Sequence, residues 1–177
     1  MSPKRRAPLT TEHALLGFLL DRPMHGYEIY QHLMEPSGLG LVWHIKQSRM
    51  YAMLARLEQA GYLSARVEPQ DNYPPRKVFH LTDAGRAVFL VWVRQPAPHG
   101  RSMRLEFLTR LYFARRLGPD VVHGLLAAQQ TACRQWLDNL HRQIAALPDP
   151  HSFEALVYRF RQGQIEAMVD WLTEIGD

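Results

Sequence analysis

The spacing of apolar residues divides the first 60 residues into short helices separated by turn signals. Apolar side chains recur at steps of three and four, the period of an α-helix. Proline and glycine mark the breaks, at Arg22-Pro23, Pro36-Ser37-Gly38 and Gly61. The pattern predicts helices over Leu9–Leu20, Tyr27–Met34 and Ser48–Gln59, with Ser48 as the N-cap of the third and a brief strand or turn at Trp43–Ile45.

Beyond Gly61 the period changes to the alternation of a β-strand. Tyr62–Val67 and Lys77–Leu81 predict two short strands, joined by a polar, proline-rich loop over Glu68–Arg76. Thr82 then caps a helix over Ala84–Arg94. Three helices followed by a hairpin is the order of a winged helix-turn-helix, whose third helix enters the major groove and whose hairpin forms the wing. Unrelated proteins use the same order for protein contacts, so a winged-helix interaction module without DNA binding is the alternative.

The second half predicts helices only. Gln95–Gly100 forms a linker, Arg101–Leu117 a helix, and two long amphipathic helices follow it. Their inward series are expected to be Val122, Leu126, Gln129, Cys133, Trp136, Leu140, Ile144 and Leu147 in Asp120–Leu147, then Phe153, Val157, Phe160, Gln164, Met168, Trp171 and Ile175 in the last helix. Such stripes are typical of a seam between two subunits, which favours a homodimer over helices that fold back on the first half.

The predicted fold class is therefore mainly α with a small β-hairpin. A basic arm at residues 1–8 precedes a winged helix-turn-helix DNA-binding domain at 9–94, and the linker at 95–100 leads to a helical dimerisation domain at 101–177. The arm can touch DNA or remain a solvated tail.

The charge is concentrated in the first half. Residues 1–94 carry 12 Lys/Arg against 8 Asp/Glu, whereas residues 95–177 carry 9 of each, so the whole net charge of +4 lies in the half expected to meet a polyanion. The apolar run Ala14–Leu20 is too short to cross a membrane and lacks a signal-peptide cleavage site. A single cysteine, Cys133, excludes an intramolecular disulfide and fits a reducing cytoplasm.

The sequence offers no catalytic or metal-binding constellation. The nine histidines are scattered without ligand spacing, and no glycine-rich phosphate loop occurs. Cys133 lies within an apolar stripe, where an inert core thiol is the expected role. We therefore expect no enzyme activity, no catalytic residue, no metal and no cofactor.

Candidate DNA contacts gather at the start of the third predicted helix and in the wing. Arg49 suits the edge of a guanine, Ser48 and Tyr51 suit phosphate, and Tyr51 alternatively packs in the core. Arg56 lies further along the helix and alternatively only decorates a solvated face. The full predicted set is His25, Tyr27, Gln47, Ser48, Arg49, Tyr51, Arg56, Tyr73, Arg76 and Lys77, of which His25 and Tyr27 open the second helix at an end suited to an anion.

Several segments, in order and with matching spacing, resemble PadR-family transcriptional regulators. They are Ala14-Leu15-Leu16-Gly17-Phe18-Leu19, Pro23-Met24-His25-Gly26-Tyr27-Glu28-Ile29, Ser48 to Glu58 with Gly61-Tyr62-Leu63, and Arg76 to Gly85. The segment Leu105–Ala114 resembles the start of the longer C-terminal domain found in one branch of that family. The third helix departs from the family pattern, since Gly-Thr-Leu-Tyr-Pro is replaced here by Ser48-Arg49-Met50-Tyr51-Ala52, with only the tyrosine in register.

This resemblance implies a repressor that binds double-stranded DNA as a homodimer on a pseudo-palindromic operator. The resemblance also favours a DNA-binding role for Tyr27 over that of an ordinary core tyrosine. The family often senses small aromatic or phenolic effectors near the dimer interface, which points to Trp92, Trp136, Phe160 and Trp171 as candidate pocket walls. Core or dimer packing is the alternative role of these four aromatic side chains.

Overall fold

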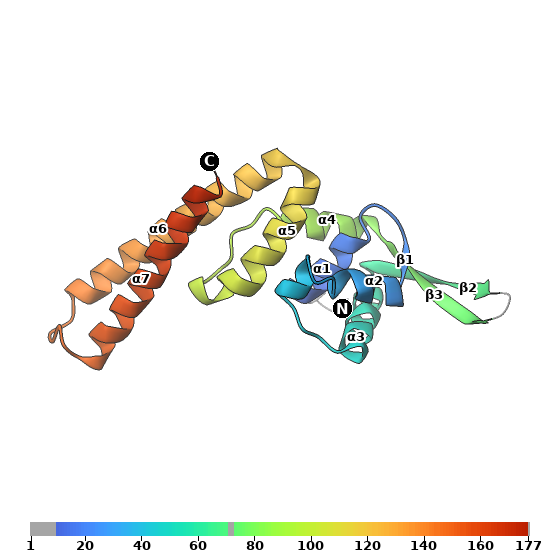
Figure 1. Cartoon of the computed structure of the whole chain (residues 1–177), viewed down its shortest axis with the longest axis horizontal. Coiled ribbons are helices and arrows are strands. Elements are labelled where there is room, and N and C mark those ends of the chain that lie inside the picture. The colour runs from blue at the N-terminus through green and yellow to red at the C-terminus, as the bar shows by residue number, and fades with distance from the viewer. Residues whose placement is uncertain (1–9, 71–72, 177) are drawn as a thin grey trace, which may run out of the picture. The chain divides into compact units, whose positions relative to one another are not determined.

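The computed structural model describes residues 10–70 and 73–176, so the predicted basic arm lies outside the described residues (Figure 1). Contacts divide the chain into two compact units. Unit 1 runs to Val93 and includes Leu108–Phe113, and unit 2 comprises Arg94–Phe107 with the chain from Ala114. The division is therefore not linear, because a stretch expected in the C-terminal domain packs within the first unit.

Unit 1 is a set of helices around a small sheet. Its elements are α1 (Thr10–Phe18), β1 (Met24–His25), α2 (Gly26–Leu33), η1 (Leu39–Leu41), α3 (Gln47–Gln59), β2 (Leu63–Gln70), β3 (Tyr73–Leu81), α4 (Asp83–Trp92) and the first residues of α5 (Leu108–Leu117). This mainly helical architecture with a small antiparallel sheet confirms the predicted fold class. The brief strand or turn expected at Trp43–Ile45 is not a strand: the segment that follows η1 has no regular structure there.

Helix α1 is the centre of unit 1. Every residue from Thr11 to Leu19 is buried, including the polar Glu12 and His13. Phe18 packs edge-on against Phe113 of α5, with ring centroids 5.3 Å apart. A fully buried helix contacts neighbours on all sides, and α1 accordingly touches α2, α3 and α4.

Helix α3 begins one residue before the predicted start and ends where predicted. Lys46 is its N-cap and makes no capping side-chain bond, so the expectation that Ser48 caps the helix was wrong. At the other end Gly61 adopts φ +76°. Its N–H bonds the Glu58 carbonyl and the Tyr62 N–H bonds the Leu57 carbonyl, the Schellman pattern that closes a helix.

The sheet is larger than the predicted hairpin. Its strand order is β1-β3-β2, all antiparallel, and β2 and β3 extend away from the helices (Figure 1). The expected loop over Glu68–Arg76 is mostly strand, with Glu68 opposite Arg76. Pro69 argued against a strand at the sequence level, because proline lacks the N–H that a strand interior needs. It lies on the edge strand β2, at an irregularity between Glu68 and Gln70 where a missing N–H is tolerated.

Unit 2 is built on two antiparallel helices, α6 (Pro119–Ala145) and α7 (Phe153–Glu174), which lie side by side (Figure 1). The chain reaches them through η2 (Gly100–Ser102), a π-helical stretch η3 (Met103–Phe107) and α5, where one helix was expected. The buried Gln129 side chain accepts a hydrogen bond from the Ala97 N–H at 2.7 Å. Within residues 10–70 and 73–176, no helix combines the length and the apolar character needed to cross a membrane.

The inward face of α7 differs from the predicted series. Ala155, Ile165 and Leu172 are the residues that bury within the chain. Phe153 and Phe160 of the predicted series are 81% and 67% exposed. The apolar stripe therefore exists, but it is turned away from α6.

We expect Gly17→Ala to destabilise unit 1. A Cβ at Gly17 would lie 2.6 Å from Phe113 and 2.7 Å from Phe89, so two buried rings would have to shift. Overpacking of this kind costs about 1–3 kcal/mol of the free energy of unfolding. Gly124→Ala in α6 is the control, because no atom lies within 4 Å of its added Cβ. It should stabilise by about 0.5–1 kcal/mol.

Urea denaturation followed by circular dichroism measures both variants. Equal stability of Gly17→Ala and Gly124→Ala would contradict the tight packing around α1.

Candidate nucleic-acid interface

One side of α3 is apolar and buried, and the other is polar and exposed. Met50, Met53, Leu54 and Leu57 pack inward. The exposed side chains at the start of the helix are Gln47, Ser48, Arg49, Tyr51 and Ala52. The N-terminal turns of α3 therefore present amide, hydroxyl and guanidinium groups together, the groups that read base edges and hold phosphates.

Tyr51 lies against the beginning of α2. A Cβ added to Gly26 would lie 2.4 Å from the Tyr51 ring and 2.8 Å from its hydroxyl, so the glycine permits this close approach. Tyr51 nevertheless stays 41% exposed, and Tyr27 beside it is 54% exposed. One edge of the Tyr51 ring therefore packs against Gly26 while much of the side chain faces solvent, and its phosphate contact stays a prediction.

His25 has a structural role at the same place. It is the N-cap of α2, and its Nδ1 accepts a hydrogen bond from the Glu28 N–H at 3.2 Å. The N-terminus of a helix is in general suited to an anion. DNA contact by His25 itself stays a prediction.

Two anchors hold α3 in unit 1. Arg56 Nε donates to Glu12 Oε1 at 2.9 Å, and the Arg56 guanidinium thereby ties the helix to buried α1. Ahead of α3, the Trp43 indole N–H donates to Thr109 Oγ1 at 2.8 Å. Arg56 remains half-exposed, so its predicted DNA contact is still open, but the structure adds a scaffold role that the sequence did not suggest.

The cations of unit 1 fall into paired and unpaired groups. Lys77 on the hairpin lies 2.6 Å from Glu58 of α3, and Arg76 lies 3.8 Å from Glu68 across the hairpin; the four side chains are between 32% and 48% exposed. Within the described part of the chain, Arg49 makes no side-chain hydrogen bond or ion pair. The predicted wing residue Tyr73 opens β3, and its side chain lies outside the described residues.

Arg22 and Glu28 form another ion pair near α2. Hydrogen bonding to Arg22 holds the pKa of the Glu28 carboxyl below its usual range. Glu28 therefore stays ionised and paired with Arg22.

The sequence did not single out three residues of this region. Lys46 adds an exposed cation at the start of α3, Gly26 admits Tyr51, and Glu12 anchors Arg56. Gly26 stood in a quoted motif, but its role depends on a tertiary contact. Glu12 is 44 residues from Arg56, and no local pattern signals such a pair.

The four candidate effector-site aromatics are distributed over both units. Trp92 is buried in unit 1, stacked on His13 at 4.6 Å, whereas in unit 2 the Trp171 ring packs edge-on against Phe107 at 6.0 Å. Phe160 is exposed. Trp136 lines a cavity in unit 2, and an effector-binding role for the four aromatic side chains stays a prediction.

Cys133 is fully buried, and burial raises the pKa of its thiol above the usual value. A neutral, inaccessible thiol is a poor nucleophile. Among the described residues, no three His, Cys, Asp or Glu side chains gather as metal ligands would.

Comparisons with known proteins bear on both units. The family model described as transcriptional regulator PadR-like family matches residues 15–90, and that of the virulence activator alpha C-terminal domain matches residues 103–176. The negative transcriptional regulator PadR of Bacillus subtilis is 26% identical over 148 residues, which cover 81% of this chain and 80% of that protein.

Solved structures of that Bacillus subtilis regulator also resemble the chain. Its complex with operator DNA is 25% identical with a TM-score of 0.48, covering 94% of this chain and 98% of that one. Its complex with p-coumaric acid is 25% identical with a TM-score of 0.45, covering 94% and 96%.

Arg56→Ala and Arg49→Ala should differ in their effect on stability, because Arg56 holds the fold together and Arg49 lies on the surface. Arg56→Ala takes from the buried Glu12 carboxylate its charged partner, and we expect a loss of roughly 1–3 kcal/mol in the free energy of unfolding. Arg49→Ala should change it by less than about 0.5 kcal/mol, because the side chain is exposed. Thermal and urea unfolding measure both, and equal losses would contradict the anchoring role.

Proposed function

Because the chain belongs to the PadR-like family of transcriptional regulators, we propose that it binds operator DNA through α3, the start of α2 and the β2–β3 hairpin. Family membership favours this function over a winged-helix module that binds only protein. The observation that carries the proposal is the polar N-terminal face of α3, exposed and backed by a buried apolar face.

Base recognition is assigned to Arg49 with its neighbour Gln47, and Ser48 is assigned to phosphate. A guanidinium without an intramolecular partner keeps its donor fork available for a guanine edge. Tyr51 and Tyr27 are assigned to phosphate, at the edge where the N-terminus of α2 adds its partial positive charge. Backbone contacts at this edge would set the register in which α3 meets the bases.

The hairpin is assigned to the DNA backbone. Exposed ion pairs such as those of Arg76 and Lys77 contribute only about 0–1 kcal/mol. Exchanging a surface carboxylate for a phosphate therefore costs little, and the released counterions favour binding. Tyr73, at the start of β3, keeps its predicted role as a further contact.

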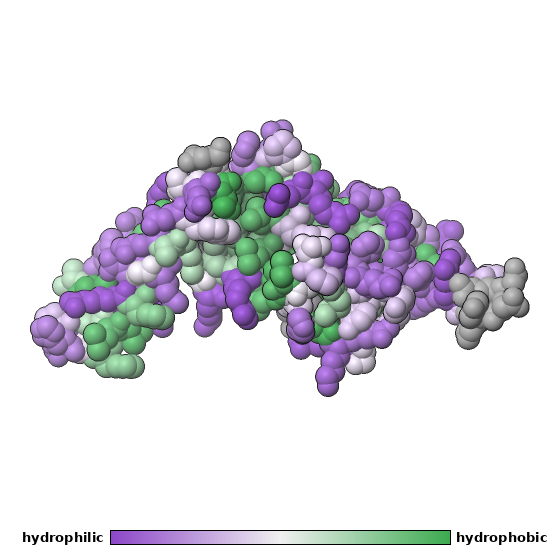
Figure 2. All heavy atoms as spheres, viewed as in Figure 1, coloured by the Kyte–Doolittle hydropathy of each residue, from purple (hydrophilic) through white to green (hydrophobic). Residues whose placement is uncertain are grey.

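The repressor is proposed to act as a homodimer through unit 2. Phe153, Leu156 and Phe160 form an exposed apolar stripe along α7, with 81%, 56% and 67% of their surfaces open. Apolar atoms are visible over the first turns of this helix (Figure 2). A two-fold axis through such a stripe pairs identical surfaces and presents two copies of α3 to a pseudo-palindromic site.

The proposed signal is a small aromatic or phenolic effector that relieves repression. The protein would act in the cytoplasm, where it meets DNA, and no catalytic step or cofactor is assigned to it.

Replacing Arg49 with alanine should weaken binding to the DNA upstream of the chain's own gene. Loss of a forked base contact costs about 1–3 kcal/mol, which is roughly five- to 150-fold in the dissociation constant. The affinity of the variant for random DNA of the same length should fall far less. Electrophoretic mobility shift at several salt concentrations measures both affinities.

Arg159→Ala on α7 removes the same charge from an exposed position outside the proposed interface and should leave both affinities unchanged. Equal losses on specific and random DNA would make Arg49 a phosphate contact. The absence of any shift at low salt would overturn the proposed function.

Phe160→Asp should separate the dimer into monomers. Each buried phenylalanine contributes about 1.5–3 kcal/mol and occurs twice in a two-fold dimer, so the dimer dissociation constant should rise by roughly a hundredfold or more. Sedimentation velocity measures this change. Val91→Asp, at a 59% exposed position in α4, is the control; a dimer unchanged by Phe160→Asp would contradict the assigned surface.

A further inference from the structure

The connection between α2 and α3 carries the start of the helix assigned to base recognition. Its first part is ordered by its own backbone, because the Val42 and Trp43 N–H groups donate to the Leu39 carbonyl. In the part of the chain that the structure describes, no backbone N–H from His44 to Lys46 donates to a backbone carbonyl. The position of this last stretch before α3 therefore depends on side-chain contacts.

Side-chain hydrogen bonds reach this stretch at two points. The Trp43 indole N–H donates to Thr109 Oγ1 at 2.8 Å, a normal length for such a bond. The Tyr30 hydroxyl lies 3.5 Å from the Ile45 carbonyl oxygen, which is the outer limit of a hydrogen bond. The bond to Thr109 is the better defined of the two, and it lies three residues before Lys46, the N-cap of α3.

Thr109 can hold Trp43 in place because α5 is itself fixed in the core of unit 1. Thr109 is fully buried, and its neighbour Arg110 is only 4% exposed. The Arg110 guanidinium lies 5.1 Å from the centre of the Trp92 ring. One turn further along, Phe113 packs edge-on against Phe89 with ring centroids 5.3 Å apart. Close-packed contacts of this kind leave a helix little freedom to rotate or slide.

Tyr112 of α5 lies beside the same connection. A Cβ added to Gly38 would lie 3.4 Å from the Tyr112 ring, so this ring borders the backbone shortly after α2. The connection therefore meets α5 near both of its ends, at Gly38 and at Trp43.

The residue that holds Trp43 comes from outside the predicted DNA-binding domain. Thr109 is 66 residues from Trp43. It belongs to Leu108–Phe113, which packs in unit 1 although the chain on either side of it belongs to unit 2. A winged helix that ended at residue 94 would lack this contact.

We propose that Thr109 is a positioning residue for DNA recognition. Its hydroxyl fixes Trp43, and with it the residues that lead into α3, so that Gln47 and Arg49 are held where base edges can be read. Thr109 is fully buried and acts through Trp43 without touching DNA. The inference rests on the proposed function, because it assumes that α3 reads bases.

The expected consequence is a loss of specificity more than of general affinity. A pre-positioned helix loses less conformational freedom when it binds, and base contacts need a closer geometric fit than phosphate contacts do. Removing the Thr109 hydroxyl should therefore weaken binding to the operator and leave binding to random DNA nearly unchanged.

Thr109→Val in the full-length chain tests this role, because valine has nearly the same shape and no hydroxyl. Electrophoretic mobility shift should show roughly tenfold weaker binding to the DNA upstream of the chain's own gene. Binding to random DNA of the same length should change by less than about twofold. Thr109→Ser keeps the hydroxyl and should stay within about twofold of the wild type on both.

Thr131→Val on α6 is the matched control. Thr131 is exposed, and its hydroxyl donates to the Ala127 carbonyl of its own helix at 2.9 Å. This variant should bind both kinds of DNA as the wild type does.

Trp43→Phe removes the donor of the same hydrogen bond while Thr109 stays intact. It should weaken specific binding at least as much as Thr109→Val does. Combining the two substitutions should add less than about twofold to the loss in Trp43→Phe, because both remove one interaction.

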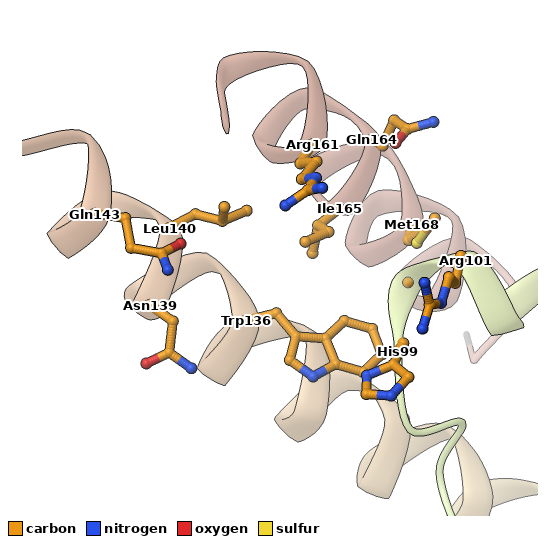
Figure 3. Close-up of a pocket in the computed structure, with 11 residues that line it drawn as sticks. His99, Arg101, Trp136, Asn139, Leu140, Gln143, Arg161, Gln164, Ile165 and Met168 are labelled. Atoms are coloured by element: carbon orange, nitrogen blue, oxygen red, sulfur yellow. The ribbon is translucent and has the colours of Figure 1, made fainter. Parts of the chain in front are cut away.

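Exchange of the indole N–H groups with solvent, followed by ¹H–¹⁵N NMR, measures the bond without DNA. Trp43→Phe identifies the Trp43 signal by its loss. Exchange at Trp43 should be roughly tenfold faster in Thr109→Val than in the wild type. The indole N–H of Trp136, which lines a cavity of unit 2 (Figure 3), is the internal reference and should exchange equally in both.

Four results would overturn the proposal. They are unchanged specific affinity in Thr109→Val, an equal loss in Thr131→Val, equal losses on specific and random DNA, and equal exchange at Trp43 with and without the hydroxyl. A wild-type chain that shifts no DNA at low salt overturns the proposed function and this role with it. A wild-type shift that is fully retained in Thr109→Val overturns this role alone.

Discussion

Burial of α1 is the constraint on which the rest of unit 1 depends. A helix with no solvent-facing side must find a partner for every polar group, and Glu12 and His13 are buried within it. Arg56 of α3 meets the first, and Trp92 of α4 stacks on the second. The ion pair holds the C-terminal half of α3 against the core, and the N-terminal half is left with its polar side in solvent.

The same division separates cations that hold the fold from cations that remain available. Arg56 is tied to a carboxylate that is almost fully buried, so giving it up would be costly. Lys77 and Arg76 have partners that stay 32% and 48% exposed, so exchanging them for phosphate costs less. Arg49 has no ion-pair partner among residues 10–70 and 73–176, so it has none to give up. The net charge of +4 does not distinguish these roles. They depend on which carboxylate each cation pairs with and on how deeply that carboxylate is buried.

Local signals predicted local structure well. The helical period, the Thr82 cap and Gly61 placed α3 and α4 closely, and Thr82 Oγ1 does accept from the Gly85 N–H. Tertiary effects were beyond such signals: β1 exists only because it pairs with β3, and Pro69 resembled a loop residue although an edge strand accommodates it. For the candidate site, the order of the predicted helices and strands was enough to identify the start of α3 as the region expected to contact DNA. The ion pair between Glu12 and Arg56 could not be predicted in this way, because it joins two segments that are far apart in the sequence.

The most direct test of the central claim uses the single cysteine. Cys133→Ala frees the chain for one new thiol, and Ala52→Cys places it on the exposed face of α3. An iron chelate tethered there should cleave upstream operator DNA at two sites separated by about one helical turn, roughly 10 base pairs or a multiple of it. Diffuse cleavage, or equal cleavage from a chelate at Thr131→Cys on the exposed side of α6, would contradict the assignment of α3 as the helix that reads DNA.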